Sequence, residues 1–240
     1  MLKQVLVIAI SFFFLNATKA QPPKNAAAVY KQGVEFMSKE MYVDAMASFF
    51  KAVALYKNYD SAYVQMGMIN VRYQSYDTAI KFYNKALDIN PKNSQACMSL
   101  ASTYRNYKND ESKALFYYLK AVAIDSTNKE ALVGAAWCYN VKKEYDLAIS
   151  YAVKALDVDN NYKPAYSEMG FAFNLSGKYA EAIIQFKKNI AISPNALPMY
   201  YCGLCYIQVK DKAGALSMYE ALINLAPKMA DALKKRIDAM

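Results

Sequence analysis

Apolar and small side chains recur at intervals of three, four and seven residues along most of this chain, with polar side chains between them. The segments SAYVQMGMINVRY (residues 61–73) and YDTAIKFYNKALDI (residues 76–89) show the pattern clearly. These intervals place the apolar side chains on one face of an α-helix, as in helices that pack against neighbours. The pattern predicts an all-helical chain, in agreement with only 7 glycines and 7 prolines among 240 residues.

The pair of predicted helices is repeated along the chain. The segment YDTAIKFYNKALDINP, which begins at Tyr76, returns as YAEAIIQFKKNIAISP at Tyr179 and, more weakly, as YDLAISYAVKALDVDN at Tyr145. Counting from these segments gives six units of 32 to 35 residues, each with two predicted helices. The units cover residues 26–59, 60–93, 94–128, 129–162, 163–195 and 196–227.

Small and aromatic residues occupy fixed positions in these units. A small residue in the first helix lets the second helix approach closely, and these residues are Gly33, Gly67, Ala101, Ala136, Gly170 and Gly203. The matching small residues of the second helix are Ala45, Ala79, Ala114, Ala148, Ala182 and Ala215. Four positions later come the residues expected to fill the space between the helices: Phe49, Tyr83, Tyr118, Ala152, Phe186 and Tyr219. Pro91, Pro194 and Pro227 are expected to stop their helices before the next unit begins.

Six copies of this pattern in one register resemble the tetratricopeptide repeat family, over about 200 of the 220 residues that follow position 20. The resemblance implies an all-α fold, a right-handed superhelical solenoid of about six helix-turn-helix repeats with a concave groove lined by first helices. Such arrays need a solvated last helix, and residues 228–240 are expected to form this capping helix. The third unit departs from the pattern by one extra residue near Lys108–Lys113, and Trp137 does not stand at the family's aromatic position.

The first twenty residues differ from the repeats. Lys3 is followed by the apolar run VLVIAISFFFL and by NATKA, which ends on a small residue. This is typical of a secretory signal peptide, so we expect a signal peptide at residues 1–20 and a short linker at 21–25. The apolar run would rise roughly 16 Å as a helix, about half of a hydrocarbon core. The sequence therefore predicts an exported protein of the Gram-negative periplasm, without a transmembrane span after signal cleavage.

Charge and composition argue against several classes of protein. Without Lys3 and Lys19 the net charge falls from +9 to +7, and the other basic residues are spread along the chain. Dispersed charge argues against a nucleic-acid partner, although a weak peripheral association with an anionic envelope surface stays open. The chain has no histidine, the commonest general base and zinc ligand. We expect no catalytic residue, no metal and no cofactor, and hence no enzyme.

The segment CGLC, from Cys202 to Cys205, has the spacing of a redox-active pair. A reactive pair of this kind normally opens a helix, whereas this one lies inside the predicted first helix of the sixth unit. Cys138 occupies the same repeat position as Cys205, where the second unit has Ile69. Because cysteine is small and readily buried, packing is the favoured explanation. A strained disulfide and a redox function are the less favoured alternatives.

The segment DVDNNYKPAYSE, residues 157–168, resembles part of a calcium-binding loop. Asp157, Asp159 and Asn161 alternate, and Glu168 stands at the twelfth position. However, Tyr162 replaces the glycine that the sharp turn of such a loop requires, and the repeat places Glu168 inside a helix. A polar turn between repeats is the better interpretation.

In the tetratricopeptide repeat family, the residues that face the groove lie on the first helix. The resemblance assigns to this groove Tyr30, Val34, Val64, Met68, Met98, Arg105, Asn106, Trp137, Asn140, Phe171, Asn174 and Tyr200. Asn140 and Asn174 are in register, and a row of amides can hold the backbone of an extended peptide. Trp137 and Phe171 are expected to anchor apolar side chains. Two alternatives stay open: the asparagines cap or fill a solvated surface, and the aromatic residues belong partly to the core.

These observations favour a non-enzymatic protein–protein interaction scaffold of the cell envelope. It would bind a peptide segment or a partner protein, of unknown identity, in its concave groove. The alternative is a structural or assembly subunit of an envelope complex that self-associates through the repeat array.

Overall fold

The computed structural model describes residues 21–240, so the expected signal peptide at residues 1–20 lies outside the described residues. In the described part, the chain forms thirteen α-helices and one π-helical turn, and no strand. They are α1 (Lys24–Ser38), α2 (Tyr42–Leu55), α3 (Asp60–Arg72), α4 (Tyr76–Ile89), α5 (Ser94–Thr103), η1 (Tyr104–Lys108), α6 (Glu111–Ile124), α7 (Lys129–Val141), α8 (Tyr145–Val158), α9 (Lys163–Leu175), α10 (Tyr179–Ile192), α11 (Ala196–Gln208), α12 (Lys212–Leu222) and α13 (Pro227–Asp238).

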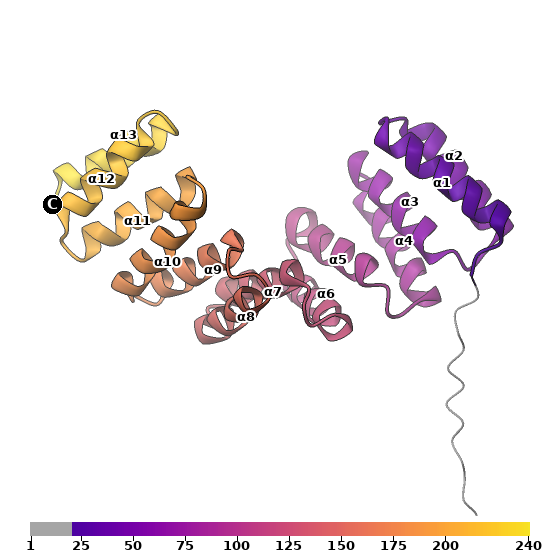
Figure 1. Ribbon diagram of the computed structural model, residues 1–240, viewed down its shortest axis with the longest axis horizontal. Coiled ribbons are helices and arrows are strands. Elements are labelled where there is room, and N and C mark those ends of the chain that lie inside the picture. The colour runs from indigo at the N-terminus through magenta and orange to yellow at the C-terminus, as the bar shows by residue number, and fades with distance from the viewer. Residues whose placement is uncertain (1–20) are drawn as a thin grey trace, which may run out of the picture.

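Each helix packs against the next one along the chain, from α1 to α13. First helices of neighbouring repeats also touch, as α3 does with α5 and α7 with α9. The array is elongated and curved, and α1–α2 and α11–α13 rise on the same side of its middle (Figure 1). The expected all-α repeat solenoid is therefore confirmed, since every contact of this kind joins elements close in sequence.

The fixed small residues permit close packing between the two helices of a repeat. A Cβ atom added to Gly33, Gly67 or Gly170 would lie 2.6, 2.3 and 2.5 Å from the nearest ring carbon. Those rings belong to the aromatic residues sixteen positions later, Phe49, Tyr83 and Phe186, as the sequence pattern predicts. Each of these rings is almost completely buried. Substituting any of these three glycines would push a ring out of a densely packed core.

Two repeats fill this space differently. The ring of Tyr118 lies against Gly134 of α7, in the next repeat, where an added Cβ would come within 2.4 Å of it. The side chain nearest to Gly203 is Leu233 of α13, not Tyr219 of its own repeat. Leu233 is fully buried, so α13 completes the core of the last repeat as well as covering its end. Pro227 is the first residue of α13, whereas α12 ends at Leu222.

The turn inside each repeat contains one residue with a left-handed backbone. In five repeats it stands at the same position, at Glu40, Gln74, Lys143, Gly177 and Lys210, with φ of 58°, 57°, 63°, 78° and 61°. Only Gly177 adopts this conformation without the steric penalty that a Cβ atom brings. The turn geometry is therefore imposed by the packing of the two helices and not by the turn residues themselves.

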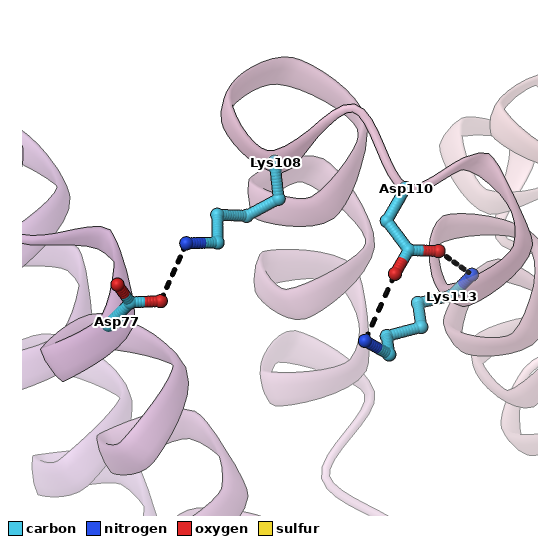
Figure 2. A network of polar contacts seen from close by, with 4 residues as sticks. All are labelled: Asp77, Lys108, Asp110 and Lys113. Atoms are coloured by element: carbon cyan, nitrogen blue, oxygen red, sulfur yellow. Dashed lines mark hydrogen bonds and ion pairs between the residues drawn. The ribbon is translucent and has the colours of Figure 1, made fainter.

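The extra residue of the third repeat is accommodated as the π-helical turn η1. Asn109 then takes the left-handed backbone, at φ 48°, and the Asp110 amide donates to the Tyr104 carbonyl at 3.1 Å. Figure 2 shows the polar contacts around this turn. The Lys108 ammonium donates to Asp77 of the preceding repeat at 2.7 Å, while the Asp110 carboxylate caps α6 through the amide of Lys113 at 3.0 Å. Contacts on both sides thus hold the π turn in place.

All four cysteines lie in the core of the array as free thiols. Burial raises the pKa of Cys138, Cys202 and Cys205 to about 12 in each case. A thiol with so high a pKa is protonated at neutral pH and is a poor nucleophile. Packing therefore accounts for these residues, as the repeat pattern predicts.

Candidate protein-interaction groove

Two adjoining hollows lie among the first three repeats, and most of the side chains that line them come from first helices and from η1. A hollow of about 540 Å³ lies among Met37 of α1, Met68 and Arg72 of α3, and Tyr107 of η1. A second hollow, of about 310 Å³, continues from it toward Met98 and Asn106. Val71, Tyr83 and Tyr107 line both, so we treat the two as one N-terminal hollow.

The π turn shapes this N-terminal hollow. By inserting one residue, η1 rotates the side chains that follow it, and Tyr107 stacks on Tyr76 with ring centroids 4.2 Å apart. Tyr107 is 45% exposed, so one face of the pair still meets solvent. Arg72 is exposed at the same hollow and forms no ion pair with any described residue within 4.0 Å. The hollow therefore offers sulfur and aromatic surface beside one unneutralised positive charge.

Five of the expected groove residues in the first three repeats fall into three groups according to their exposure. Val34 and Met68 are exposed, at 39% and 36%, and Asn106 is exposed as well. Met98 is half-buried and lines the N-terminal hollow. Val64, however, is only 2% exposed and belongs to the core, so it presents no surface to a ligand.

Tyr30 is half-buried and packs partly into the core. Its ring stacks on Tyr59 at 4.8 Å and lies 5.5 Å from the ring of Phe49. Burial raises the pKa of its hydroxyl. The interpretation of the inner aromatic residues as partly core therefore holds for Tyr30.

In the middle repeats, the expected groove side chains mostly contact other residues of the protein. The guanidinium carbon of Arg105 lies 4.2 Å from the centre of the Trp137 ring, so Arg105 covers the expected aromatic anchor. Asn140 is 6% exposed and donates to the carbonyl oxygen and to Oε2 of Glu168, at 3.0 and 2.9 Å. The amide of Asn140 therefore joins α7 to α9, and does not stand free to hold a peptide backbone.

Glu168 is itself almost completely buried. Burial raises the pKa of its carboxyl, and the hydrogen bond from Asn140 and the charge of Arg105 act in the opposite direction. Sequence reasoning considered Glu168 only as the last residue of a calcium-like loop. In the structure Glu168 lies inside α9, and Asp157 lies near the end of α8. The carboxylate of Asp159 accepts a hydrogen bond from the Lys129 ammonium at 2.6 Å. No group of three potential metal ligands occurs in residues 21–240.

The last two repeats carry two further hollows. One, of about 480 Å³, lies between Asn174, Leu204 and Arg236 of the capping helix. Asn174 there accepts a hydrogen bond from the Cys205 thiol at 3.3 Å. The other, of about 320 Å³, lies between α9 and α11 and includes Phe171. We call this second one the α9–α11 hollow.

Phe171 and Tyr200 are half-buried and packed in a run of aromatic rings. The Phe171 ring meets Phe186 and Tyr201 edge to face at 5.4 and 5.0 Å, and Tyr200 meets Tyr201 at 5.8 Å. Each of the two keeps part of its surface accessible to solvent. The three asparagines do not form a row of equivalent free amides, because only Asn106 is exposed.

Sequence reasoning did not single out Val71, Tyr76 or Tyr107 as groove residues. The only signal in the sequence was the extra residue of the third repeat, which indicates a departure from the repeat geometry near position 108. Whether an insertion lengthens the turn or enters the helix depends on the packing of both neighbours, and the one-dimensional pattern does not contain that information.

Comparison with known proteins also indicates a tetratricopeptide repeat protein. A family model described as tetratricopeptide repeat matches residues 60–93 and 94–128. The photosystem I assembly protein Ycf3 of Cyanophora paradoxa is 31% identical over 84 residues, which are 34% of this chain and 49% of that protein. The chain thus matches about half the length of this curated relative.

Similar solved structures cover most of the chain at low identity. The structure of PilW, described as a widely conserved type IV pilus biogenesis factor, covers 88% of this chain and 99% of its own, at 19% identity and TM-score 0.76. YrrB is described as a protein with an unusual peptide-binding site. Its structure covers 78% of this chain and 97% of its own, at 23% identity and TM-score 0.65. A repeat protein from Parabacteroides merdae covers 90% of both chains, at 20% identity and TM-score 0.72. At these identities the likeness is one of fold.

Proposed function

Because the chain is a tetratricopeptide repeat protein, we propose that it is a non-enzymatic scaffold of the cell envelope that binds a segment of a partner protein. The family match and the solenoid fold support the general role, since proteins with these repeats are protein-interaction scaffolds. The N-terminal hollow is the place where we expect the partner to dock.

The observation that carries this proposal is the composition of the N-terminal hollow. Met68, Val71 and Tyr107 offer flexible and aromatic apolar surface, and methionine adapts to side chains of different shape. Arg72 adds a charge without a partner among the described residues, which favours a segment with an acidic group beside an apolar one. Exposed apolar side chains gathered in a concavity are typical of contact surfaces.

The proposed location in the envelope rests on the sequence. Residues 1–20 have the signal-peptide pattern, and no helix in residues 21–240 is long and apolar enough to cross a bilayer. The likeness of fold to PilW, a pilus biogenesis factor, is compatible with such a location. Cleavage at Ala20 would leave the repeats free on the far side of the inner membrane.

The test is affinity purification from envelope extracts after gentle cross-linking, with wild type and Met68→Glu as baits. Ile184→Glu is the matched control, because Ile184 is 53% exposed and lies on α10, whose residues do not line this hollow. Loss of the captured proteins by about tenfold with Met68→Glu, but not with the control, is expected for a groove contact. Capture unchanged by Met68→Glu would overturn docking in this hollow.

Self-association through the repeat array is the second candidate function. Phe50 and Phe116, on the second helices α2 and α6, are 52% and 60% exposed and supply apolar surface outside the groove. Molar mass measured over a hundredfold range of concentration separates the candidates. A mass that rises with concentration and returns to the monomer in Phe116→Ser favours the assembly subunit, and a constant monomer mass excludes it.

A further inference from the structure

A hollow near the end of the array combines free hydrogen-bond donors with aliphatic side chains. It has a volume of about 480 Å³ and lies mainly between α9, α11 and α13, and we call it the C-terminal hollow. Its lining includes the polar residues Asn174 and Arg236 and the apolar residues Leu204 and Ile207. This volume and this mixture of side chains are typical of sites that bind small organic groups.

The thiol of Cys205 fixes the orientation of the Asn174 amide. Cys205 is completely buried, and burial raises the pKa of its thiol to about 12, so the sulfur keeps its proton at neutral pH. The thiol donates to Oδ1 of Asn174, with 3.3 Å between the sulfur and the oxygen. Because the oxygen and the nitrogen of a carboxamide point in different directions, this hydrogen bond turns Nδ2 of Asn174 away from Cys205.

The Nδ2 atom of Asn174 is a free donor at the surface. It donates to no described residue, and it does not belong to the buried side-chain atoms without a partner, which are Oδ1 of Asn140, Oδ1 of Asn189 and Oε1 of Gln185. Nδ2 is therefore accessible. Because Asn174 lines the C-terminal hollow, its two N–H groups are available to a guest there.

Arg236 brings a positive charge to the same hollow. Its side chain is exposed and forms no ion pair within 4.0 Å with any described residue. The closest acid in the sequence of α13, Asp238, is paired with Lys234. Asp211, which follows α11, caps α12 by accepting from the Gly214 amide at 2.8 Å. The guanidinium of Arg236 is therefore left to an anion from outside the chain.

The ends of α9 and α11 lie beside the hollow, but most of their carbonyl groups are occupied. Carbonyl oxygens without partners at a helix C-terminus would repel an anion. In α9 the carbonyls of residues 172–174 accept backbone amides of the following turn, and in α11 those of residues 205–207 do the same. Lys178 and Lys210, which are exposed in these two turns, add positive charge. The field at this edge of the array therefore favours an anionic guest.

We infer that the C-terminal hollow binds a carboxylate group attached to an aliphatic chain. The carboxylate accepts hydrogen bonds from Nδ2 of Asn174 and from the Arg236 guanidinium. The aliphatic part of the guest packs against Leu204 and Ile207. Cys205 is a positioning residue, because its thiol decides which end of the Asn174 amide is presented to the guest. The inference does not depend on docking in the N-terminal hollow, since the two hollows share no residue.

The experiment uses small probes and the isotope-labelled full chain. The first probe is 4-methylpentanoate, which is titrated while the side-chain amide signals of Asn174 and Gln208, both in the lining, are followed by NMR. The matched probe is 4-methylpentanamide, which has the same aliphatic group and no charge. Saturable shifts of the Asn174 signal, with a dissociation constant of about 1 mM, are expected for the carboxylate. The amide should bind more weakly by about tenfold or more.

A third probe distinguishes two sources of the carboxylate. N-acetyl-leucine has the same aliphatic group and carboxylate beside an amide, as at the carboxyl terminus of a protein. Tighter binding of N-acetyl-leucine than of 4-methylpentanoate identifies the guest as the end of a protein chain. Equal binding, or tighter binding of 4-methylpentanoate, identifies it as a free aliphatic acid.

Two substitutions test the donors. Asn174→Asp keeps an acceptor for the Cys205 thiol and replaces both N–H donors by a negative charge, so it should abolish binding of 4-methylpentanoate. Arg236→Gln should weaken binding by about tenfold or more. Lys235→Gln is the matched control, because Lys235 is exposed on the same helix and does not line the hollow. In buffer at physiological ionic strength, the control should change the dissociation constant by less than about twofold.

The positioning role of Cys205 has its own control. Cys205→Ala lets the Asn174 amide rotate and should weaken binding by about three- to tenfold. Cys205→Ser keeps a donor to Asn174 and should bind 4-methylpentanoate as wild type does. Cys202→Ala removes an equally buried thiol that has no hydrogen bond to Asn174, so it should leave binding unchanged. Wild-type binding by Cys205→Ala would show that Cys205 only fills space.

The inference is overturned if the carboxylate and its amide bind equally, if neither binds, or if Asn174→Asp binds the carboxylate as wild type does. Its failure is distinguishable from failure of the proposed function. Absence of carboxylate binding, together with partner capture that is lost in Met68→Glu, removes only this inference. Carboxylate binding without any captured protein removes only the proposed docking in the N-terminal hollow.

Discussion

The ring of Tyr107 stacks on the ring of Tyr76 with centroids 4.2 Å apart and planes inclined by 12°. Tyr107 belongs to the π turn of the third repeat, and Tyr76 is the first residue of α4 in the second. The contact therefore joins two repeats, and it does so at the wall of the N-terminal hollow. A single inserted residue has created both the contact and part of the candidate binding surface.

This stacking should be measurable as a coupling energy. In a double-mutant cycle of Tyr107→Ala and Tyr76→Ala, we expect the two changes to be non-additive by about 0.5–1.5 kcal/mol in the free energy of unfolding. Urea denaturation of the two single variants and the double variant gives the coupling directly. Additive effects would mean that the rings do not stabilise the joint between the repeats.

The left-handed turn residues allow a stabilising substitution. Lys143→Gly should stabilise the protein by about 0.5–1 kcal/mol, because φ 63° is strained for lysine and unstrained for glycine. Gly177→Ala, at the same position of the next repeat, should destabilise by about 1 kcal/mol. An added Cβ at Gly177 meets nothing within 4 Å, so the backbone alone is responsible. Thermal unfolding of both variants checks the prediction, which fails if both shift in the same direction.

The buried carboxyl of Glu168 should make stability depend on pH. Its pKa is raised in the folded state, chiefly by burial, so the folded protein binds this proton more tightly than the unfolded chain does. Its contribution is then most favourable below the unfolded pKa of about 4.3 and is lost as the pH rises through the raised folded pKa.

The variant Glu168→Gln removes this titration. We expect the unfolding free energy of the variant to exceed that of wild type near neutral pH, and the difference to shrink toward pH 4. Within the window between the two pKa values, the difference changes by at most about 1.4 kcal/mol per pH unit. Urea midpoints from pH 4 to 8 provide the measurement. A difference that is constant with pH would show that the folded pKa is not raised.

The four thiols should be unreactive in the folded protein. Because they are buried and the pKa values of Cys138, Cys202 and Cys205 are raised to about 12, an aromatic disulfide reagent at pH 8 should label them only as fast as the chain opens. In denaturant the same reagent should label all four at once. Rapid labelling of two thiols in the folded state would contradict this prediction, and it would favour a redox role for the pair Cys202 and Cys205.

The sequence by itself determined the repeated helix pairs, the small residues that let them approach, and the aromatic residues that fill the gaps. These features are local and periodic, so each copy of the pattern reinforces the others. Gly67 with Tyr83 and Gly170 with Phe186 are examples in which the predicted partners meet. The burial of Cys202 and Cys205 follows from the same register.

Only the tertiary structure decided which groove positions are open. Asn140 stands at the repeat position of a ligand-binding amide, but its side chain donates a hydrogen bond to Glu168 of the next repeat. Trp137 is covered by Arg105 of the previous repeat. The extra residue became a π turn, which brought Tyr107 to the hollow. The physical reason is the same in each case. Helical periodicity says which face a side chain occupies, whereas its availability depends on what the adjacent repeats place against that face.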